Sequence, residues 1–358
     1  MTHTNVIDVP YLPRDVEGFS PRIGIIGCGG ISGMHLAAYR RAGYLVVALC
    51  DIDLARAEAR RDEFFPSADV YDSPESLLSR DDIEIVDIAT HVDVRPALVA
   101  SALTHGRHVL SQKPFVRALA DGDSLIALAS EKNLQLSVNQ NGRWAPHFAY
   151  LLSAVRVGLI GTVTSADFAA YWAHDVEFQH HPVFAQMHDL VLYDFGIHWF
   201  DVIARLFAGR AATRVTSTVR MTEGQLIPAP TSATALIDYE GAQVSVIFRA
   251  ASHFDDFGSY RVEGTHGVIS HEGAALGGPT VTVCTADGAR AVDLEGDWWQ
   301  NGMHGTMSEL IGAVHSGVPA DNTAANSLDG LRLCFAAIHS SRSDSPIDPR
   351  TVGGLDAD

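Results

Sequence analysis

Between residues 22 and 140, short apolar runs alternate with segments of helical periodicity, and this alternation constrains the fold more than any other feature. Strands separated by helices need crossover connections, which produce parallel pairing. The runs IEIVDIAT and LVVALC are apolar nearly throughout, as strands covered on both faces must be. We therefore predict a doubly wound parallel sheet over residues 21–143. The expected strands are 22–28, 45–51, 69–71, 83–90, 108–112 and 134–140, and the expected helices are 32–42, 54–65, one opening at 73–75, 95–105 and 124–132.

After residue 143 the rhythm changes, because alternating polar and apolar runs follow one another without helices between them. This pattern favours antiparallel pairing. We predict a second α/β domain, with a largely antiparallel open sheet, over residues 144–358, and an N-terminal arm over residues 1–20. The expected strands are 162–171, 213–221, 232–239, 242–250 and 259–264, and the expected helices are 148–157, 189–207, 303–315 and 328–341.

The chain is acidic, with a formal net charge of −18 over 358 residues. Phosphate backbones and anionic lipids would repel it, so we expect neither nucleic acid nor a membrane as partner. Its N-terminus has no basic start and no apolar core of a signal peptide. Scattered cysteines without a C-x-x-C pair indicate reduced thiols, and we expect a cytoplasmic protein. The cysteines are Cys28, Cys50, Cys284 and Cys334.

A glycine-rich turn follows the first expected strand and opens the first helix. Glycines there permit a tight turn and a close approach of a pyrophosphate, which the helix N-terminus favours. Asp51 ends the second strand, where a carboxylate accepts hydrogen bonds from the ribose and repels a 2′-phosphate. We predict a Rossmann domain that binds NAD rather than NADP, although Arg56, in the next helix, is a residue type that binds the 2′-phosphate of NADP. The alternatives are a glycine turn without a nucleotide and a flavin site. The expected contacts are Gly27, Gly29, Gly30, Ile31, Ser32 and Asp51.

Two further segments carry residues suited to proton transfer. Lys113 ends the fifth strand, at the sheet edge where doubly wound folds bind ligands. Asp194 and His198 are spaced i, i+4, so one helical face would present both, with the carboxylate orienting the imidazole. Gly196 lies between them and lowers helix stability by about 1 kcal/mol relative to alanine. The competing interpretations are a solvated lysine at a strand end and a core histidine.

From residue 22 to about 341, the chain resembles the Gfo/Idh/MocA family of glucose–fructose oxidoreductase and inositol dehydrogenase. The segments that carry the resemblance are GCGGISGMH (27–35), Asp51, AT (89–90), AL..GRHVLSQKP (102–114), NQNGRW (139–144), GLIGTV (158–163), DFGIHWFD (194–201) and EGTHG (263–267). The resemblance implies that a lysine and an Asp-x-x-x-His pair act on a substrate alcohol, and it implies a homodimer or homotetramer. The residues at these positions are Lys113, Asp194 and His198 for catalysis; Thr90, Gln112, Lys113 and Gln140 for cofactor; and Asn141 and Arg143 for substrate.

The chain departs from the family pattern at two places. The usual glutamate before the lysine is Gln112, which removes an anion beside Lys113. The usual T-P-N-x-x-H reads Thr90-His91-Val92-Asp93-Val94-Arg95, so the proline, asparagine and histidine are all replaced. His91 either substitutes in the site or caps the next helix.

These residues together predict an NAD(H)-dependent dehydrogenase acting on a secondary alcohol of a sugar, cyclitol or related polyol. His198 or Lys113 would accept the hydroxyl proton. The alternatives are an enzyme that cleaves glycosides through transient oxidation and a non-catalytic dinucleotide-sensing protein. Trp298 and Trp299 form either an aromatic wall against a sugar ring or part of the core. A metal site is the remaining hypothesis, although we predict none, and it would draw on His174, Asp175, His180, His181, His188, Asp189, Asp194 and His198.

Overall fold

A computed structural model describes residues 9–355 of the chain. It divides into two compact units, each made of separate segments. The Rossmann unit contains Leu12–Trp144 and Trp299–Leu328, and the sheet unit contains Ala145–Trp298, the described residues from Asp329 onward and those up to Tyr11. The sequence predicted a single continuous second domain from residue 144. The structure differs because a late segment of the chain packs in the first unit.

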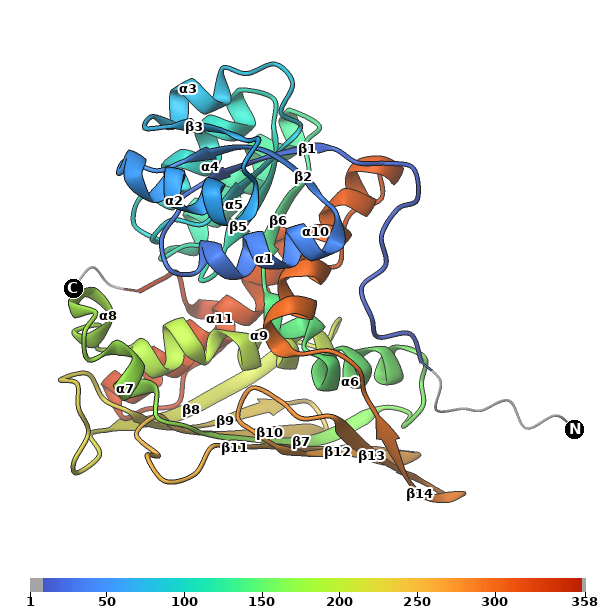
Figure 1. The fold of residues 1–358 in the computed structure, drawn as a ribbon. Helices are drawn as coiled ribbons and strands as arrows, with labels where there is room; N and C mark the ends of the chain where they lie inside the picture. Colours follow the sequence, from blue (N-terminus) through green and yellow to red (C-terminus); the bar gives the residue numbers. More distant parts are fainter. Residues whose placement is uncertain (1–8, 356–358) are drawn as a thin grey trace, which may run out of the picture. The chain divides into compact units, whose positions relative to one another are not determined.

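The Rossmann unit is built on a six-stranded sheet with the order β3-β2-β1-β4-β5-β6. Every neighbouring pair in it is parallel, which confirms the predicted doubly wound sheet (Figure 1). Strand order reverses between β1 and β4, and ligands of such sheets bind at the carboxyl ends near this point. The strands are β1 (Arg22–Ile26), β2 (Leu45–Cys50), β3 (Asp69–Tyr71), β4 (Ile85–Ile88), β5 (His108–Gln112) and β6 (Leu136–Asn139).

Helices connect these strands, close to the predicted positions. The largest difference is at α5, which begins at Leu119 rather than at residue 124. The start was missed because Gly122 and its flanking aspartates resemble a loop; a Cβ on Gly122 would lie 2.8 Å from Leu328, so close packing requires the glycine. The helices are α1 (Ser32–Ala42), α2 (Leu54–Phe64), α3 (Pro74–Leu78), α4 (Arg95–Thr104), α5 (Leu119–Glu131) and η1 (Asn141–Trp144), a 3-10 turn.

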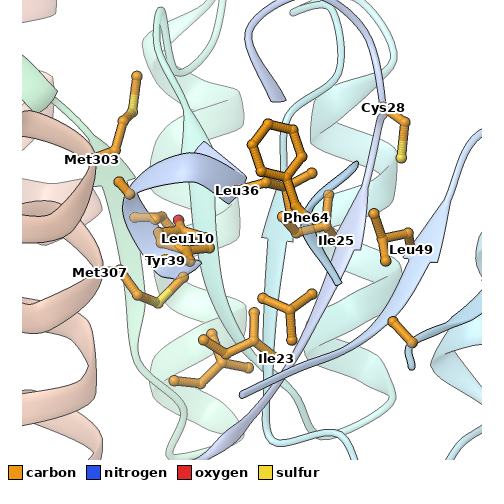
Figure 2. Packing of buried hydrophobic residues seen from close by; sticks show 14 of the residues in the cluster. Ile23, Ile25, Cys28, Leu36, Tyr39, Leu49, Phe64, Leu110, Met303 and Met307 are labelled. Atoms are coloured by element: carbon orange, nitrogen blue, oxygen red, sulfur yellow. The ribbon is translucent and has the colours of Figure 1, made fainter. Parts of the chain in front are cut away.

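Helix α10 (Trp298–Ser316) explains the discontinuous unit. Its Met303 and Met307 are buried against the Rossmann core beside Leu36 and Tyr39 of α1 (Figure 2). The described end of the predicted N-terminal arm also packs here, since Asp15 pairs with His304 at 2.9 Å. Residues 1–8 of that arm lie outside the described residues. The sequence pattern alone did not indicate which domain this helix would join.

The sheet unit contains an eight-stranded sheet with the order β14-β13-β12-β11-β7-β10-β9-β8. Only β7 and β10 pair in parallel among these strands, which confirms a largely antiparallel sheet. Three helices, α6 (Pro146–Arg156), α9 (Ile197–Leu206) and α11 (Ala324–Ser343), cover one face (Figure 1). The last three strands were not among those predicted from the sequence, although β13 alternates between buried and exposed residues. The strands are β7 (Val163–Tyr171), β8 (Ala212–Arg220), β9 (Ser232–Tyr239), β10 (Ala242–Arg249), β11 (Phe257–Gly264), β12 (Gly267–Gly273), β13 (Thr280–Thr285) and β14 (Gly288–Asp293).

The predicted long helix over 189–207 is divided, with a π-helical turn, η2 (Val191–Phe195), before α9 (Ile197–Leu206). Gly196 joins the two. A Cβ there would lie 2.8 Å from the Leu192 carbonyl oxygen and 3.0 Å from the Phe248 ring, so the wider turn requires glycine. Single π-helical turns occur frequently at functional sites. The remaining helices are α6 (Pro146–Arg156), α7 (His174–Phe178), α8 (Pro182–Ala185), α11 (Ala324–Ser343) and the 3-10 turn η3 (Pro349–Thr351).

None of the helices within residues 9–355 combines the length and the hydropathy that a bilayer span requires.

Candidate active site

The turn between β1 and α1 leaves open space above its backbone. Gly27 has a φ of +101°, and a Cβ on it would lie 2.9 Å from the backbone of Ala89, so the fold itself requires this glycine. Cβ atoms on Gly29 or Gly30 would meet no atom within 4 Å. Ile31 occupies the N-cap of α1, so the first N–H groups of the helix receive no side-chain cap. Such a helix start favours an anionic group such as a pyrophosphate.

Asp51 is held in place beside this turn. One carboxylate oxygen accepts the Cys28 N–H at 2.8 Å, and the other accepts the Asp53 N–H at 2.9 Å. Each oxygen retains a lone pair, so the carboxylate can also accept hydrogen bonds from ribose hydroxyls. Ile52 follows it with 89% of its surface exposed, an apolar face that suits a planar base and that the sequence analysis missed. In the sequence, the indication of this apolar face was Ile52 directly after Asp51, the acid that follows β2.

Arg60, another residue that the sequence analysis missed, lies closer to the turn than Arg56. Its guanidinium donates to the Gly29 carbonyl at 3.3 Å and lies against Gly33, where a Cβ would be 3.2 Å away. Arg56 instead pairs with Asp53 at 3.3 Å on the surface. Arg60, and not Arg56, is therefore the arginine near the turn that bears on the choice between NAD and NADP. Sequence spacing could not distinguish two arginines one helical turn apart.

The Ser32 hydroxyl stabilises the same turn by donating to the Gly29 carbonyl at 2.6 Å. The Cys28 thiol within it is inert. Burial, and then the negative charge of Asp51, raise the pKa of Cys28 to about 12, so the thiol stays protonated near neutral pH. This turn therefore binds through its backbone and Asp51 and supplies no nucleophile.

Lys113 lies at the carboxyl end of β5 with a half-buried side chain. Its N–H donates to the side-chain oxygen of the buried Gln112 at 3.0 Å, and the Lys113–Pro114 peptide is cis. Thr90, which follows β4, is joined to this segment by Arg95, whose guanidinium bonds carbonyls of both. The structure thus brings Thr90, Gln112 and Lys113 together at one edge of the sheet.

Three of the predicted site residues at this end of the sheet hold buried polar atoms for which the described residues supply no hydrogen-bond partner. They are the hydroxyl of Thr90, the amide oxygen of Gln140 and the amide nitrogen of Asn141. Buried polar atoms are usually paired, so an orphaned set indicates a missing ligand or water. With the open glycine turn and Asp51, these atoms fit a dinucleotide.

Two other predicted residues in the Rossmann unit have structural contacts. Arg143 is buried, and its guanidinium donates to the Asp321 carbonyl at 2.6 Å. His91 pairs with Asp93 at 3.0 Å. Helix α4 begins at Arg95 with Val94 as its N-cap, so His91 does not cap it.

The sheet unit carries the other predicted catalytic residues. Asp194 lies in the π-helical turn and His198 in the first turn of α9, where His198 is 6% exposed. The His198 ring meets Trp298 at 5.3 Å with an interplanar angle of 83°. Trp298 is 4% exposed and also packs against Phe148 and Trp199, so it belongs to an aromatic cluster and is not an exposed wall.

The carboxylates of the histidine-rich segment contact side chains from other segments. Asp175 is buried and pairs with His253 at 2.9 Å, and Asp189 pairs with Arg342 at 2.5 Å. His174 packs against the Trp172 ring. Within residues 9–355, no three histidine, cysteine, aspartate or glutamate side chains gather as metal ligands would.

Comparison with protein families matches both parts of the chain. Residues 21–140 match the model described as an oxidoreductase family with an NAD-binding Rossmann fold, and residues 148–270 match the Gfo/Idh/MocA C-terminal domain. Among curated proteins, a D-apiose dehydrogenase of Paraburkholderia graminis is 34% identical over 62% of this chain and 58% of its own length. A second D-apiose dehydrogenase, from Rhizobium rhizogenes, is 29% identical over 62% of this chain and 64% of its own length. The chain therefore matches less than two thirds of the length of these relatives.

Solved structures share the fold. An oxidoreductase from Agrobacterium radiobacter in complex with NAD⁺, L-tartaric acid and magnesium superimposes with a TM-score of 0.82 at 22% identity, over 92% of this chain and 99% of that one. A levoglucosan dehydrogenase in complex with NADH and levoglucosan gives a TM-score of 0.80 at 18% identity, over 92% of this chain and 99% of that one. At these identities the likeness establishes the architecture.

Proposed function

The chain belongs to the Gfo/Idh/MocA oxidoreductase family, and we propose that it is an NAD-dependent dehydrogenase of a secondary alcohol on a sugar, cyclitol or related polyol. The observation that carries the proposal is the open space above Gly29 and Gly30, beside the preoriented carboxylate of Asp51. A helix N-terminus and an acid in this arrangement suit the pyrophosphate and the adenosine ribose of NAD.

The cofactor would be held by this chain at two places. The backbone of Gly27, Gly29, Gly30, Ile31 and Ser32 would bind the pyrophosphate, and Asp51 the ribose. Thr90, Gln112, Lys113 and Gln140 would bind its other half, where orphaned polar atoms of Thr90 and Gln140 support the assignment. When bound, NAD supplies the acceptor for a hydride from the carbinol carbon.

We assign the proton chemistry to Lys113, Asp194 and His198. His198 accepts the substrate hydroxyl proton, and Asp194 orients the imidazole and stabilises its protonated form. Lys113 donates a hydrogen bond to the developing alkoxide oxygen. The burial of His198 supports this role, since a shielded imidazole exchanges its proton with substrate rather than with bulk water. Asn141 and Arg143 are proposed to orient the polyol.

The substrate class follows from the relatives. The curated relatives are named for oxidation of D-apiose, and another, from Burkholderia multivorans, is named an inositol 2-dehydrogenase. We therefore propose an aldose or cyclitol with a free secondary hydroxyl as the substrate.

A substrate panel tests this function. Purified protein is mixed with NAD and, separately, with D-apiose, other aldoses, inositols and acyclic polyols, and NADH is followed by its absorbance; the series is repeated with NADP. We expect one compound class to reduce NAD, and NADP to be used poorly because Asp51 repels its 2′-phosphate. No reduction of either cofactor by any member of the panel would contradict the proposal.

We also propose a cytoplasmic homo-oligomer. The described cysteines are all free thiols, which supports a reducing compartment. One face of the eight-stranded sheet supports a subunit interface, because Leu236 on β9 is a large apolar side chain that is 42% exposed. Sedimentation of the purified protein measures the assembly.

A further inference from the structure

Arg95 makes an unusual set of contacts at the carboxyl edge of the Rossmann sheet. Its Nε and Nη2 atoms donate to the Thr90 carbonyl at 3.1 and 2.6 Å. Its Nη1 atom donates to the Gln112 carbonyl at 2.6 Å and also to the Pro114 carbonyl. One guanidinium therefore joins the turn after β4 to both residues that flank Lys113.

These carbonyls lie where the sheet ends, and the Gln112 carbonyl also accepts a longer bond from the Ser111 hydroxyl at 3.3 Å. Thr90 lies two residues beyond the end of β4, and Gln112 is the last residue of β5, so the ladder of sheet hydrogen bonds does not extend past them. Buried carbonyl groups without a partner are destabilising. Arg95 is 3% exposed, so it supplies these bonds away from water, where they are strong.

Arginine is the side chain that can make this arrangement. Its planar guanidinium carries five N–H donors in a fixed fork and stays charged. A lysine ammonium is a compact point charge, and an imidazole has two ring nitrogens at most, so neither can reach three separated carbonyls in this geometry. Arg95 stands where the family pattern has histidine, and the neighbouring Gln112 replaces a glutamate that would compete for the guanidinium.

Gln112 secures the same segment from a second direction. Its side-chain oxygen accepts the Lys113 N–H at 3.0 Å, while its own carbonyl accepts from Arg95. The backbone of Lys113 is thus fixed on both sides by neighbours that are themselves buried. A lysine whose backbone is fixed loses fewer conformations when its side chain meets a substrate.

We propose that Arg95 is a positioning residue, whose guanidinium holds the Lys113 segment against the turn after β4 and so fixes the Lys113 side chain for catalysis. This inference rests on the proposed function, in which Lys113 contacts the substrate oxygen. Displacement of a reacting group by about 1 Å lowers turnover roughly 100-fold. Arg95 therefore acts through Lys113 and contacts neither substrate nor reacting atoms.

The same sheet provides a matched control at the opposite ends of its strands, the amino ends. Arg107 precedes β5, and its guanidinium donates to the carbonyls of Leu78, Arg80 and Ile83 at 3.3, 2.8 and 2.9 Å. It joins the segment before β4 to the start of β5 with the same chemistry. Substitution at Arg107 removes a comparable set of bonds far along the strands from Lys113.

The test compares Arg95→Lys with Arg107→Lys in the full-length protein. Hydrogen–deuterium exchange is followed at the Lys113 amide, NADH binding by fluorescence, and kcat with the best substrate of the panel. In Arg95→Lys we expect faster exchange at Lys113 and a kcat that falls roughly 10- to 100-fold, with a much smaller change in the Kd for NADH. In Arg107→Lys we expect exchange at Lys113 and kcat close to those of the wild type.

The outcomes separate this inference from the proposed function. Unchanged exchange at Lys113 in folded Arg95→Lys, or equal losses of kcat in both variants, overturns the positioning role. If the wild type oxidises no polyol, the proposed function has failed, and the exchange comparison alone decides whether Arg95 fixes the segment. Thermal melting establishes that each variant is folded; if Arg95→Lys is not, Arg95→His is judged by the same criteria.

Discussion

At the scale of single residues, glycines in one turn have different tasks. Gly27 serves the fold, because its positive φ and the nearby Ala89 backbone leave no room for a side chain. Gly29 and Gly30 face open space, so the absence of a side chain there leaves room for a ligand. The sequence pattern predicted the turn but could not separate these tasks, since they depend on atoms sixty residues away in the chain.

This difference predicts opposite effects of two substitutions. Gly29→Val should leave the melting temperature nearly unchanged and weaken NADH binding by a factor of roughly 10 to 100, because the side chain fills the space for the pyrophosphate. Gly27→Ala should destabilise the fold by about 1–3 kcal/mol. Thermal melting and NADH fluorescence titration measure both. Tight NADH binding by Gly29→Val would contradict the assignment of this turn to the cofactor.

At the scale of elements, the sequence predicted the strands of the first sheet closely, because short apolar runs bounded by helices leave little choice of pairing. The π-helical turn before α9 was not predictable, since it depends on shifted hydrogen bonds, such as the one from the Gly196 N–H to the Val191 carbonyl, which the sequence pattern does not indicate. Strand β14 was not predictable because it is largely exposed and has no buried apolar face. Arg60 and Arg95 were missed as site residues because their contacts join separate elements.

A stacked histidine pair between α6 and β12 makes the stability of the sheet unit depend on pH. The rings of His147 and His271 lie 4.6 Å apart. Burial, and then the charge that His271 would carry, lower the pKa of His147 well below its usual value, and burial lowers that of His271. Both imidazoles therefore bind protons less readily in the folded state than in the unfolded chain, which binds them below a pH of about 6.5. Stability is flat above that pH and is lost as the pH falls below it.

Replacement of His147 by phenylalanine tests this linkage. In the wild type, the free energy of unfolding should fall between pH 6.5 and 5 by up to about 1.4 kcal/mol per pH unit for each histidine that titrates. His147→Phe keeps an aromatic ring in the stack and should show a shallower fall. Urea unfolding at several pH values gives the slope, and equal slopes for the two proteins would show that His147 does not carry the dependence.

At the scale of the whole molecule, the two compact units divide the proposed work. The Rossmann unit carries the cofactor turn, Asp51 and Lys113, and it is completed by α10 from late in the chain. The sheet unit carries Asp194 in the π-helical turn and His198 on α9. Loss of His198 should therefore abolish chemistry while it leaves dinucleotide binding intact.

Turnover of His198→Ala with saturating NAD and the best polyol of the panel tests this account most directly. His266→Ala, an exposed histidine in the turn between β11 and β12, serves as the control. We predict that His198→Ala loses roughly 10²- to 10⁴-fold in kcat, with wild-type affinity for NADH, and that His266→Ala keeps full activity. Near-normal turnover by His198→Ala would contradict the account.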